Sequence, residues 1–208
     1  MYDDTIVAIA TAPGPGALGV VRLSGPQALS VASRLFGRPL PDHRVVHGPL
    51  VDPATGGVLD EVMATYLAAP RSYTREDMVE LSCHGGPATL QRVLGALLAQ
   101  GARAANPGEF TLRAFLNGRV DLVQAEAVLD VVQAPTPRAL DLALQGMAGA
   151  LSAQVRQVRA QVLELLAYLT AMVDFPEEGI DPEQVEPSLA LAVEALERLL
   201  ASAGVGMV

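Results

Sequence analysis

The stretch DTIVAIATAPGPGALGVVRLSG, residues 4–25, joins two apolar runs through a loop rich in glycine and proline. Gly14, Gly16 and Gly19 have the G-x-G-x-x-G spacing of a dinucleotide-binding fingerprint. That fingerprint needs a helix after its last glycine, because the helix N-terminus receives the pyrophosphate. VVRLSG follows instead, and its β-branched, alternating pattern predicts a strand. The context therefore argues against nucleotide binding here and favours a strand–loop–strand connection.

Around this connection, the first 118 residues alternate predicted strands with predicted helices. The turn-forming segment DPATGG lies between two of the strands, so we expect these two to form a hairpin. The further strands are expected at 44–51, 58–69, 77–84 and 102–105, and the helices at 26–37, 86–101 and 109–117. This half of the chain is therefore predicted to be an α+β domain with a mixed sheet.

The second half has a helical pattern only. Asp121 and Gln124 form a capping-box signature for a helix that ends near Gln133, before two prolines. A long helical stretch follows to about Val173, with a break near 146–149, and a last helix is expected over 187–203 after a turn. We therefore predict a domain boundary at 118/119, with an all-α domain over 119–208.

Composition narrows the classes of partner. Half of the 208 residues are hydrophobic and 18% are charged, which is typical of a chain with a packed core. The net charge is −9, and residues 119–208 hold most of the excess of acids over arginines. Such an acidic surface repels the phosphate backbone, so this chain alone is a poor candidate for binding nucleic acid. Its apolar runs are too short for a membrane span, and no signal peptide is visible.

Few residues have the pattern of a catalytic or metal site. Cys83 and His84 are adjacent, and neighbours on a strand point to opposite faces, so we expect no nucleophilic pair. No metal site is expected, because no set of His, Cys and acidic residues has ligand spacing. Arg22 and Glu80 each lie among apolar residues of a predicted strand. Arg22 either pairs with Glu80 or lies on a solvated face. Alternatively, the two residues line a polar pocket for an anionic or amide-rich ligand.

Four stretches together resemble the MnmE (TrmE) family of tRNA-modification GTPases. They are residues 4–25, SYTREDMVELSCHGGP at 72–87, NPGEFTLRAFLNGRVDLVQAEAV at 106–128 and VDFPEEGI at 173–180. The resemblance covers nearly the whole chain in the family's order. It implies that the first domain resembles the folate-binding domains of aminomethyltransferases, dimerises, and binds a tetrahydrofolate derivative (5-formyl- or methylene-tetrahydrofolate).

The resemblance also implies which residues contact the folate. Arg22, Glu80 and Arg119 fall on the family's folate-contacting positions, and the position of Arg119 is commonly lysine in relatives. A planar guanidinium does not replace an ammonium in every geometry. The family acts in the cytoplasm with a flavoprotein partner, MnmG. Together they add an aminomethyl-type group to carbon five of the wobble uridine of tRNA, with the folate as one-carbon donor.

The family's nucleotide site has no counterpart in these residues. The chain contains no lysine, so it has no G-x-x-x-x-G-K-[ST] loop. We therefore expect a fragment that ends before the inserted GTPase domain. It would supply folate binding and dimerisation but would hydrolyse no GTP and bind no potassium or magnesium through a nucleotide site. The alternative is a dimerisation and docking scaffold without ligand binding. A stand-alone aminomethyltransferase would need a general base and a larger second domain, and neither is found.

Overall fold

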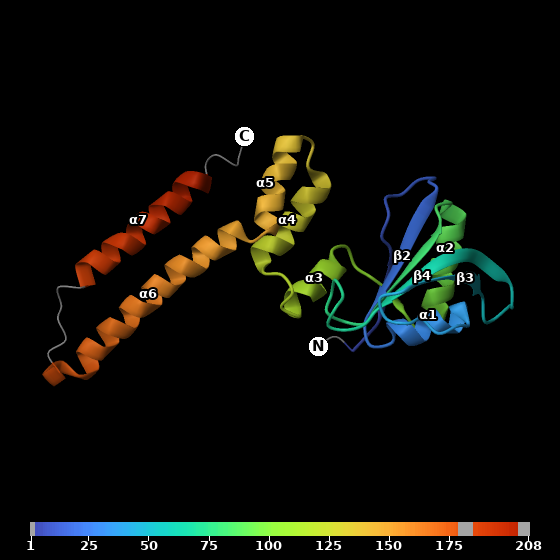
Figure 1. Ribbon diagram of the computed structural model, residues 1–208, viewed down its shortest axis with the longest axis horizontal. Helices are drawn as coiled ribbons and strands as arrows, with labels where there is room; N and C mark the ends of the chain where they lie inside the picture. Colours follow the sequence, from blue (N-terminus) through green and yellow to red (C-terminus); the bar gives the residue numbers. More distant parts are fainter. Residues whose placement is uncertain (1–2, 179–184, 204–208) are drawn as a thin grey trace. The chain divides into compact units, whose positions relative to one another are not determined.

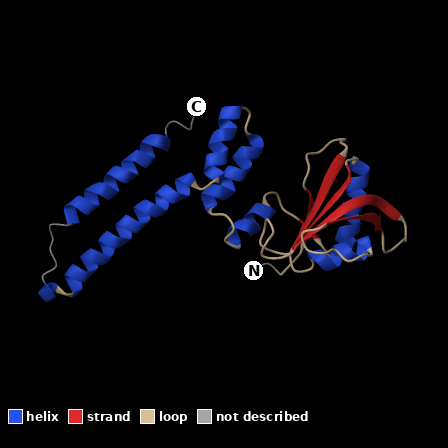
Figure 2. Cartoon of the chain, in the orientation of Figure 1, coloured by secondary structure: helices blue, strands red, loops and turns tan. Residues whose placement is uncertain are grey.

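The computed structural model describes residues 3–178 and 185–203 of the chain. The chain divides into two compact units, Met1–Val120 and Asp121–Val208. The division lies two residues after the boundary expected from the sequence. Each unit is described by itself below, and Figures 1 and 2 show the elements that belong to each. The predicted turn over 175–187 lies partly outside the described residues.

The N-terminal unit is built on a six-stranded mixed sheet with the order β3-β4-β5-β2-β1-β6. β1 pairs in parallel with β6, and every other neighbouring pair is antiparallel. The strands are β1 (Ile6–Ile9), β2 (Leu18–Ser24), β3 (Val45–Val51), β4 (Val58–Leu67), β5 (Met78–His84) and β6 (Arg103–Ala104). The α+β prediction is confirmed, and each predicted strand is present with slightly different ends.

Two helices, α1 (Ala28–Phe36) and α2 (Pro87–Ala99), cover one face of this sheet. Alternate strand residues point into the core between the sheet and these helices, among them Val21, Leu23, Val79 and Leu81. Gly37 ends α1 in the left-handed conformation (φ 65°), which costs glycine no Cβ clash. The hydrophobic alternation therefore assigns the buried face, and the other face stays available for function.

The glycine loop after β1 folds back onto the junction between β5 and α2. The amide of Gly16 donates to the carbonyl of Gly85 (3.1 Å). A Cβ on Gly85 would lie 2.5 Å from the Gly16 carbonyl oxygen, so only glycine allows this approach. The segment after Gly19 is strand β2, as predicted, and no helix follows the fingerprint spacing. Gly85 thus serves the close packing of the loop backbone against the start of α2.

The second unit contains only helices among its described residues. They are α4 (Leu122–Gln133), α5 (Pro137–Met147), α6 (Ala150–Asp174), the short 3₁₀ helix η1 (Pro176–Glu178) and α7 (Val185–Ala203). The predicted capping box is present: the Asp121 carboxylate accepts from the Gln124 amide (3.0 Å), and the Gln124 side chain accepts from the Asp121 amide (2.9 Å). The last helix begins at Val185, two residues earlier than predicted.

Helices α6 and α7 run side by side in opposite directions (Figure 1). The break between α5 and α6 falls at Gly149, whose φ of 78° no longer fits a helix. Across the described ranges, no helix combines the length and the apolar character that a bilayer crossing requires. The helical unit therefore confirms the all-α prediction.

Candidate functional site

Arg22 and Glu80 lie directly opposite each other on β2 and β5, on the sheet face that α1 and α2 leave open. Nε and Nη2 of Arg22 both point at one carboxylate oxygen of Glu80, Oε1, at 2.8 and 2.7 Å. The two side chains keep 29% and 32% of their surface exposed. The pairing, one of the alternatives that the sequence left open, is present, and the pair remains within reach of a ligand.

The second carboxylate oxygen of Glu80 has no hydrogen-bond partner within residues 3–178 and 185–203. Among the described residues, no hydrogen bond reaches Oε2 of Glu80 and none leaves Nη1 of Arg22. A carboxylate can accept about four hydrogen bonds, so Glu80 keeps acceptor capacity while Arg22 stabilises its charge. The pair thus presents an acceptor and a donor side by side on an open surface.

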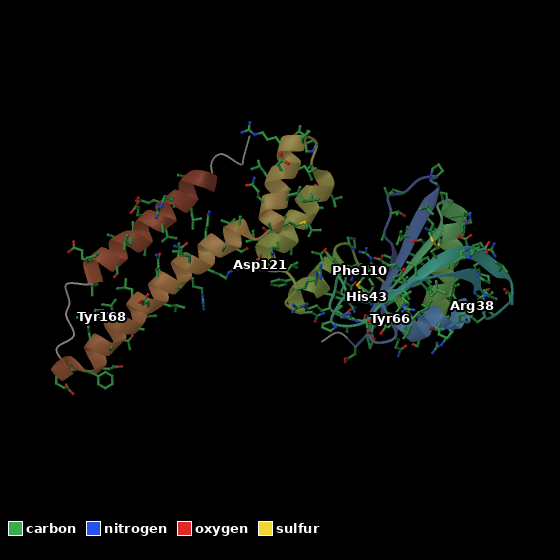
Figure 3. All side chains as sticks on the ribbon, in the orientation of Figure 1. Arg38, His43, Tyr66, Phe110, Asp121 and Tyr168 are labelled. Atoms are coloured by element: carbon green, nitrogen blue, oxygen red, sulfur yellow. The ribbon has the colours of Figure 1, made fainter. Side chains whose placement is uncertain are left out.

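Two aromatic rings border this pair. The guanidinium carbon of Arg22 lies 5.8 Å from the centre of the Tyr73 ring and 5.7 Å from that of Phe110. Tyr73 comes from the loop before β5, and Phe110, labelled in Figure 3, comes from α3 (Glu109–Leu116). Both distances are within the range of cation–π attraction. The rings therefore place apolar surface next to the charged pair of Arg22 and Glu80.

Arg119 joins the same cluster from the segment after α3. Its guanidinium carbon lies 5.6 Å from the centre of the Tyr73 ring, and its Nη1 donates to the carbonyl of Ser72 (3.2 Å). The three residues selected from the sequence, Arg22, Glu80 and Arg119, are therefore gathered at one place. Tyr73 contacts two of them, although Arg22 and Arg119 are far apart in sequence.

The comparisons with known proteins agree with this architecture. The family model described as "GTP-binding protein TrmE N-terminus" matches residues 5–119, and "MnmE helical domain" matches residues 122–208. The chain belongs to the MnmE family. The two matched regions correspond to the sheet-containing unit and the helical unit of the structure.

Curated relatives match along the whole chain. A protein of Chloroflexus aurantiacus named "tRNA modification GTPase MnmE" is 55% identical over 99% of this chain and 46% of its own length. Proteins of the same name from Roseiflexus castenholzii and Geobacillus kaustophilus are 53% and 46% identical, over 100% and 99% of this chain. The chain spans about half the length of these MnmE relatives.

A buried ionic cluster holds α3, and with it Phe110, against the sheet. Arg113 is 0% exposed and donates to the Asp4 carboxylate (2.7 Å), to Glu109 (3.1 Å) and to Glu76 (3.2 Å). Arg103 donates to Glu109 as well (2.6 Å), and this bond is the main reason why the pKa of Glu109 falls from 4.5 to about 2. The cluster ties the N-terminus, the loop before β5 and α3 into one support for the site.

Sequence reasoning did not find the aromatic walls or this support. Tyr73 and Phe110 lie in the stretches that resemble the MnmE family, but nothing in their local pattern marks them as neighbours of Arg22. Arg113 was not a candidate, although an arginine amid the apolar residues of EFTLRAFL could have signalled a buried ion pair. Their proximity depends on contacts between segments that are distant in sequence.

The other candidates do not form a reactive centre. Cys83 is buried in the core, where desolvation raises the pKa of its thiol to about 12. His84 points outward, and its Nδ1 lies 2.6 Å from Oδ1 of Asp60, which raises the pKa of the imidazole. In the described ranges, no three His, Cys, Asp or Glu side chains are arranged to hold a metal. The adjacent cysteine and histidine are directed apart, as predicted.

The helical unit contains a hollow of about 330 Å³ between α6 and α7. Its walls are almost wholly apolar, formed by Val155, Val158, Arg159, Val162, Leu163, Leu196 and Leu199. Arg159 is the one charged side chain in this lining, so the hollow offers little for recognising a polar ligand. The cluster on the open sheet face remains the better candidate for chemistry.

Proposed function

We propose that the N-terminal unit binds a tetrahydrofolate derivative at the cluster of Arg22, Glu80 and Arg119. The observation that carries this proposal is the arrangement of a half-exposed acceptor, Glu80, beside two guanidinium groups and two aromatic rings. A reduced folate offers the complementary chemistry: ring N–H donors, flat rings and a tail with two carboxylates. Membership of the MnmE family supports the same ligand class.

In this proposal, the two ends of the ligand meet different ends of the cluster. Oε2 of Glu80 is the acceptor for pterin N–H groups, because Oε1 is already held by Arg22. A carboxylate of the glutamate tail then pairs with Arg119, whose side chain is the more exposed of the two arginines. Tyr73 and Phe110 line the space between these contacts. Each polar group of the site thereby has a ligand group with the opposite charge or the complementary hydrogen-bonding role.

We further propose that the unit dimerises through the open sheet face. Val45 and Met63 lie on this face by their register with Thr65 and Ser82, and they keep 63% and 44% of their surface exposed. A second copy placed here would cover these side chains. It would also exclude water from the one-carbon group of the ligand, which that chemistry requires.

The proposal for the whole protein follows the family. In the cytoplasm, a dimer acts with the flavoprotein MnmG to install an aminomethyl-type group at carbon five of the wobble uridine of tRNA. The folate supplies one carbon, and GTP hydrolysis with potassium and magnesium takes place in a separate GTPase domain. These 208 residues contain no lysine and hence no P-loop, so we expect them to hydrolyse no GTP.

Titration calorimetry with 5-formyltetrahydrofolate tests the ligand. Binding by the unmodified chain, with losses of about tenfold or more in Glu80→Gln and Arg22→Ala, is the expected result, since each change removes a charge-assisted contact. Glu126→Gln is the control, because Glu126 is an exposed carboxylate on α4 of the helical unit and belongs neither to the cluster nor to the open sheet face. No binding at millimolar ligand would contradict the proposal.

Sedimentation of the same samples separates the proposal from a pure scaffold. A dimer that binds the folate supports both parts of the proposed function. A dimer without folate affinity would favour a dimerisation and docking scaffold. A monomer would contradict dimerisation of this chain, whatever its affinity for folate.

A further inference from the structure

The Tyr73 ring is the contact shared by the two arginines of the candidate site. The guanidinium carbons of Arg22 and Arg119 lie 5.8 and 5.6 Å from its centre. Two cations brought close together repel each other, and each long side chain loses rotamer freedom when it is held in one place. The negative face of an aromatic ring offsets both costs.

The ring itself is fixed from two sides. Its hydroxyl is hydrogen-bonded to the hydroxyl of Thr111 on α3 (3.0 Å). The neighbouring backbone is also fixed, because the Ser72 carbonyl accepts from Arg119 and the Thr74 carbonyl accepts from the Asn117 side chain (2.7 Å). Tyr73 therefore sits in a loop that is tied to both ends of α3.

We propose that Tyr73 is a positioning residue that fixes the spacing of Arg22 and Arg119 for the two ends of the ligand. This inference rests on the proposed folate binding. Arg22 already uses two nitrogens on Glu80, so its position sets the heterocycle end of the site. Arg119 has one backbone contact besides the ring, so the ring determines where its charge meets a carboxylate tail.

Phe110 is not equivalent to Tyr73. Its ring lies 5.7 Å from the Arg22 guanidinium carbon, and the structure shows no corresponding contact between Phe110 and Arg119. Loss of the Phe110 ring would therefore disturb the position of Arg22 but not that of Arg119. Loss of Tyr73 would disturb both ends, which makes the two residues separable by experiment.

The test compares folate affinities of Tyr73→Leu and Tyr73→Phe by calorimetry. We expect Tyr73→Leu to lose about tenfold in affinity for 5-formyltetrahydrofolate, because two cation–π contacts are lost. Tyr73→Phe keeps the ring and should stay within about threefold of the unmodified chain, since only the part-buried hydrogen bond to Thr111 is lost. Tyr168→Leu on α6 is the matched control and should bind as the unmodified chain does.

A double-mutant cycle with Arg119→Ala distinguishes positioning from a general structural effect. If Tyr73 acts through Arg119, the two losses will not multiply in Tyr73→Leu/Arg119→Ala. The inference would be overturned if the two losses of affinity multiply, or if Tyr73→Leu binds folate as tightly as the unmodified chain. Neither outcome would contradict folate binding itself. Failure of the unmodified chain to bind would overturn the proposed function itself. Should Tyr73→Leu unfold, Tyr73→Met carries the same test, because its flexible side chain adapts to the gap.

Discussion

In the N-terminal unit, Ile6, Val21 and Leu23 are 0% exposed, whereas Val158 and Leu165, the most buried large aliphatic residues described in the helical unit, keep 7% and 8% of their surface. Most of the exposed large hydrophobic side chains also belong to the helical unit. A sheet covered by two helices encloses a core, but helices packed mainly in pairs each leave an apolar side uncovered. The site is accordingly found on the unit that has a complete core to hold it.

The units also differ in their charged contacts. Arg113 in the N-terminal unit is 0% exposed and has three carboxylate partners. Arg156 in the helical unit is 66% exposed and pairs with Asp121 at 3.4 Å. Buried pairs are costly to break and exposed pairs contribute little, so the same substitution should cost much more stability in the N-terminal unit than in the helical unit. Four predictions test this difference, from the largest expected effect to the smallest.

Arg113→Met should destabilise the N-terminal unit by about 3–5 kcal/mol, because Glu76 would remain largely buried without its arginine partner and Glu109 would lose one of its two. Urea unfolding followed by circular dichroism measures the loss, and hydrogen exchange of the strand amides locates it. Arg156→Met is the control and should cost no more than about 1 kcal/mol. Similar losses of unfolding free energy in both variants would contradict the proposed difference between buried and exposed ion pairs in the two units.

Leu23→Ala should cost about 3 kcal/mol, because it opens a cavity in the enclosed core below the sheet. Leu166→Ala on α6 should cost less than about 1 kcal/mol, since that side chain is 56% exposed. Thermal and urea unfolding of the two variants give the comparison. A larger loss for Leu166→Ala would show that the exposed face of α6 is covered in solution.

Glu109→Gln should cost about 2 kcal/mol at pH 7, because charge-assisted bonds from Arg103 and Arg113 are weakened. The pKa of Glu109 is lowered from 4.5 to about 2 in the folded chain. As the pH falls, the Glu109 carboxylate is therefore protonated at a higher pH in the unfolded chain than in the folded chain. The stabilisation of the fold by this charge is complete above pH 4.5 and is lost as the pH approaches 2.

Unfolding of Glu109→Gln beside the unmodified chain, from pH 7 down to pH 2, checks the sign of this effect. The difference in unfolding free energy should narrow as the pH falls through that window. Glu126→Gln, on the exposed surface of α4, serves as the control. A difference that stays constant with pH would mean that the carboxylate charge does not stabilise the fold.

Asp121→Ala should have the smallest effect, about 1 kcal/mol, because it removes the N-cap of α4. The Gln124 amide, which donates to the Asp121 carboxylate, is the main cause of the lowered pKa of this group. Hydrogen exchange in the first turn of α4 measures the loss, which should leave the sheet amides unchanged. Thr136→Ala removes the N-cap of α5 and should cost a similar amount of stability for the same reason.

Much of the fold was predictable because its signals are local. Alternation marked the strands on both sides of the glycine loop, and Asp121 with Gln124 marked the start of α4. The pairing of Arg22 with Glu80 was one of the alternatives left open, since charged residues in apolar strands rarely lack a partner. The resemblance to the MnmE family identified Arg119 as a further candidate, and its folate role stays a prediction.

By itself, the sequence determined the order of elements, the buried faces and the family, because each follows from short-range periodicity or from long matching stretches. Only the tertiary structure decided that Arg113 is buried beside Asp4, 109 residues away, and that Tyr73 and Phe110 border Arg22. Those contacts depend on how β2, the loop before β5 and α3 pack together. No local pattern encodes that packing, because its free energy arises when distant segments exclude water from a common interface.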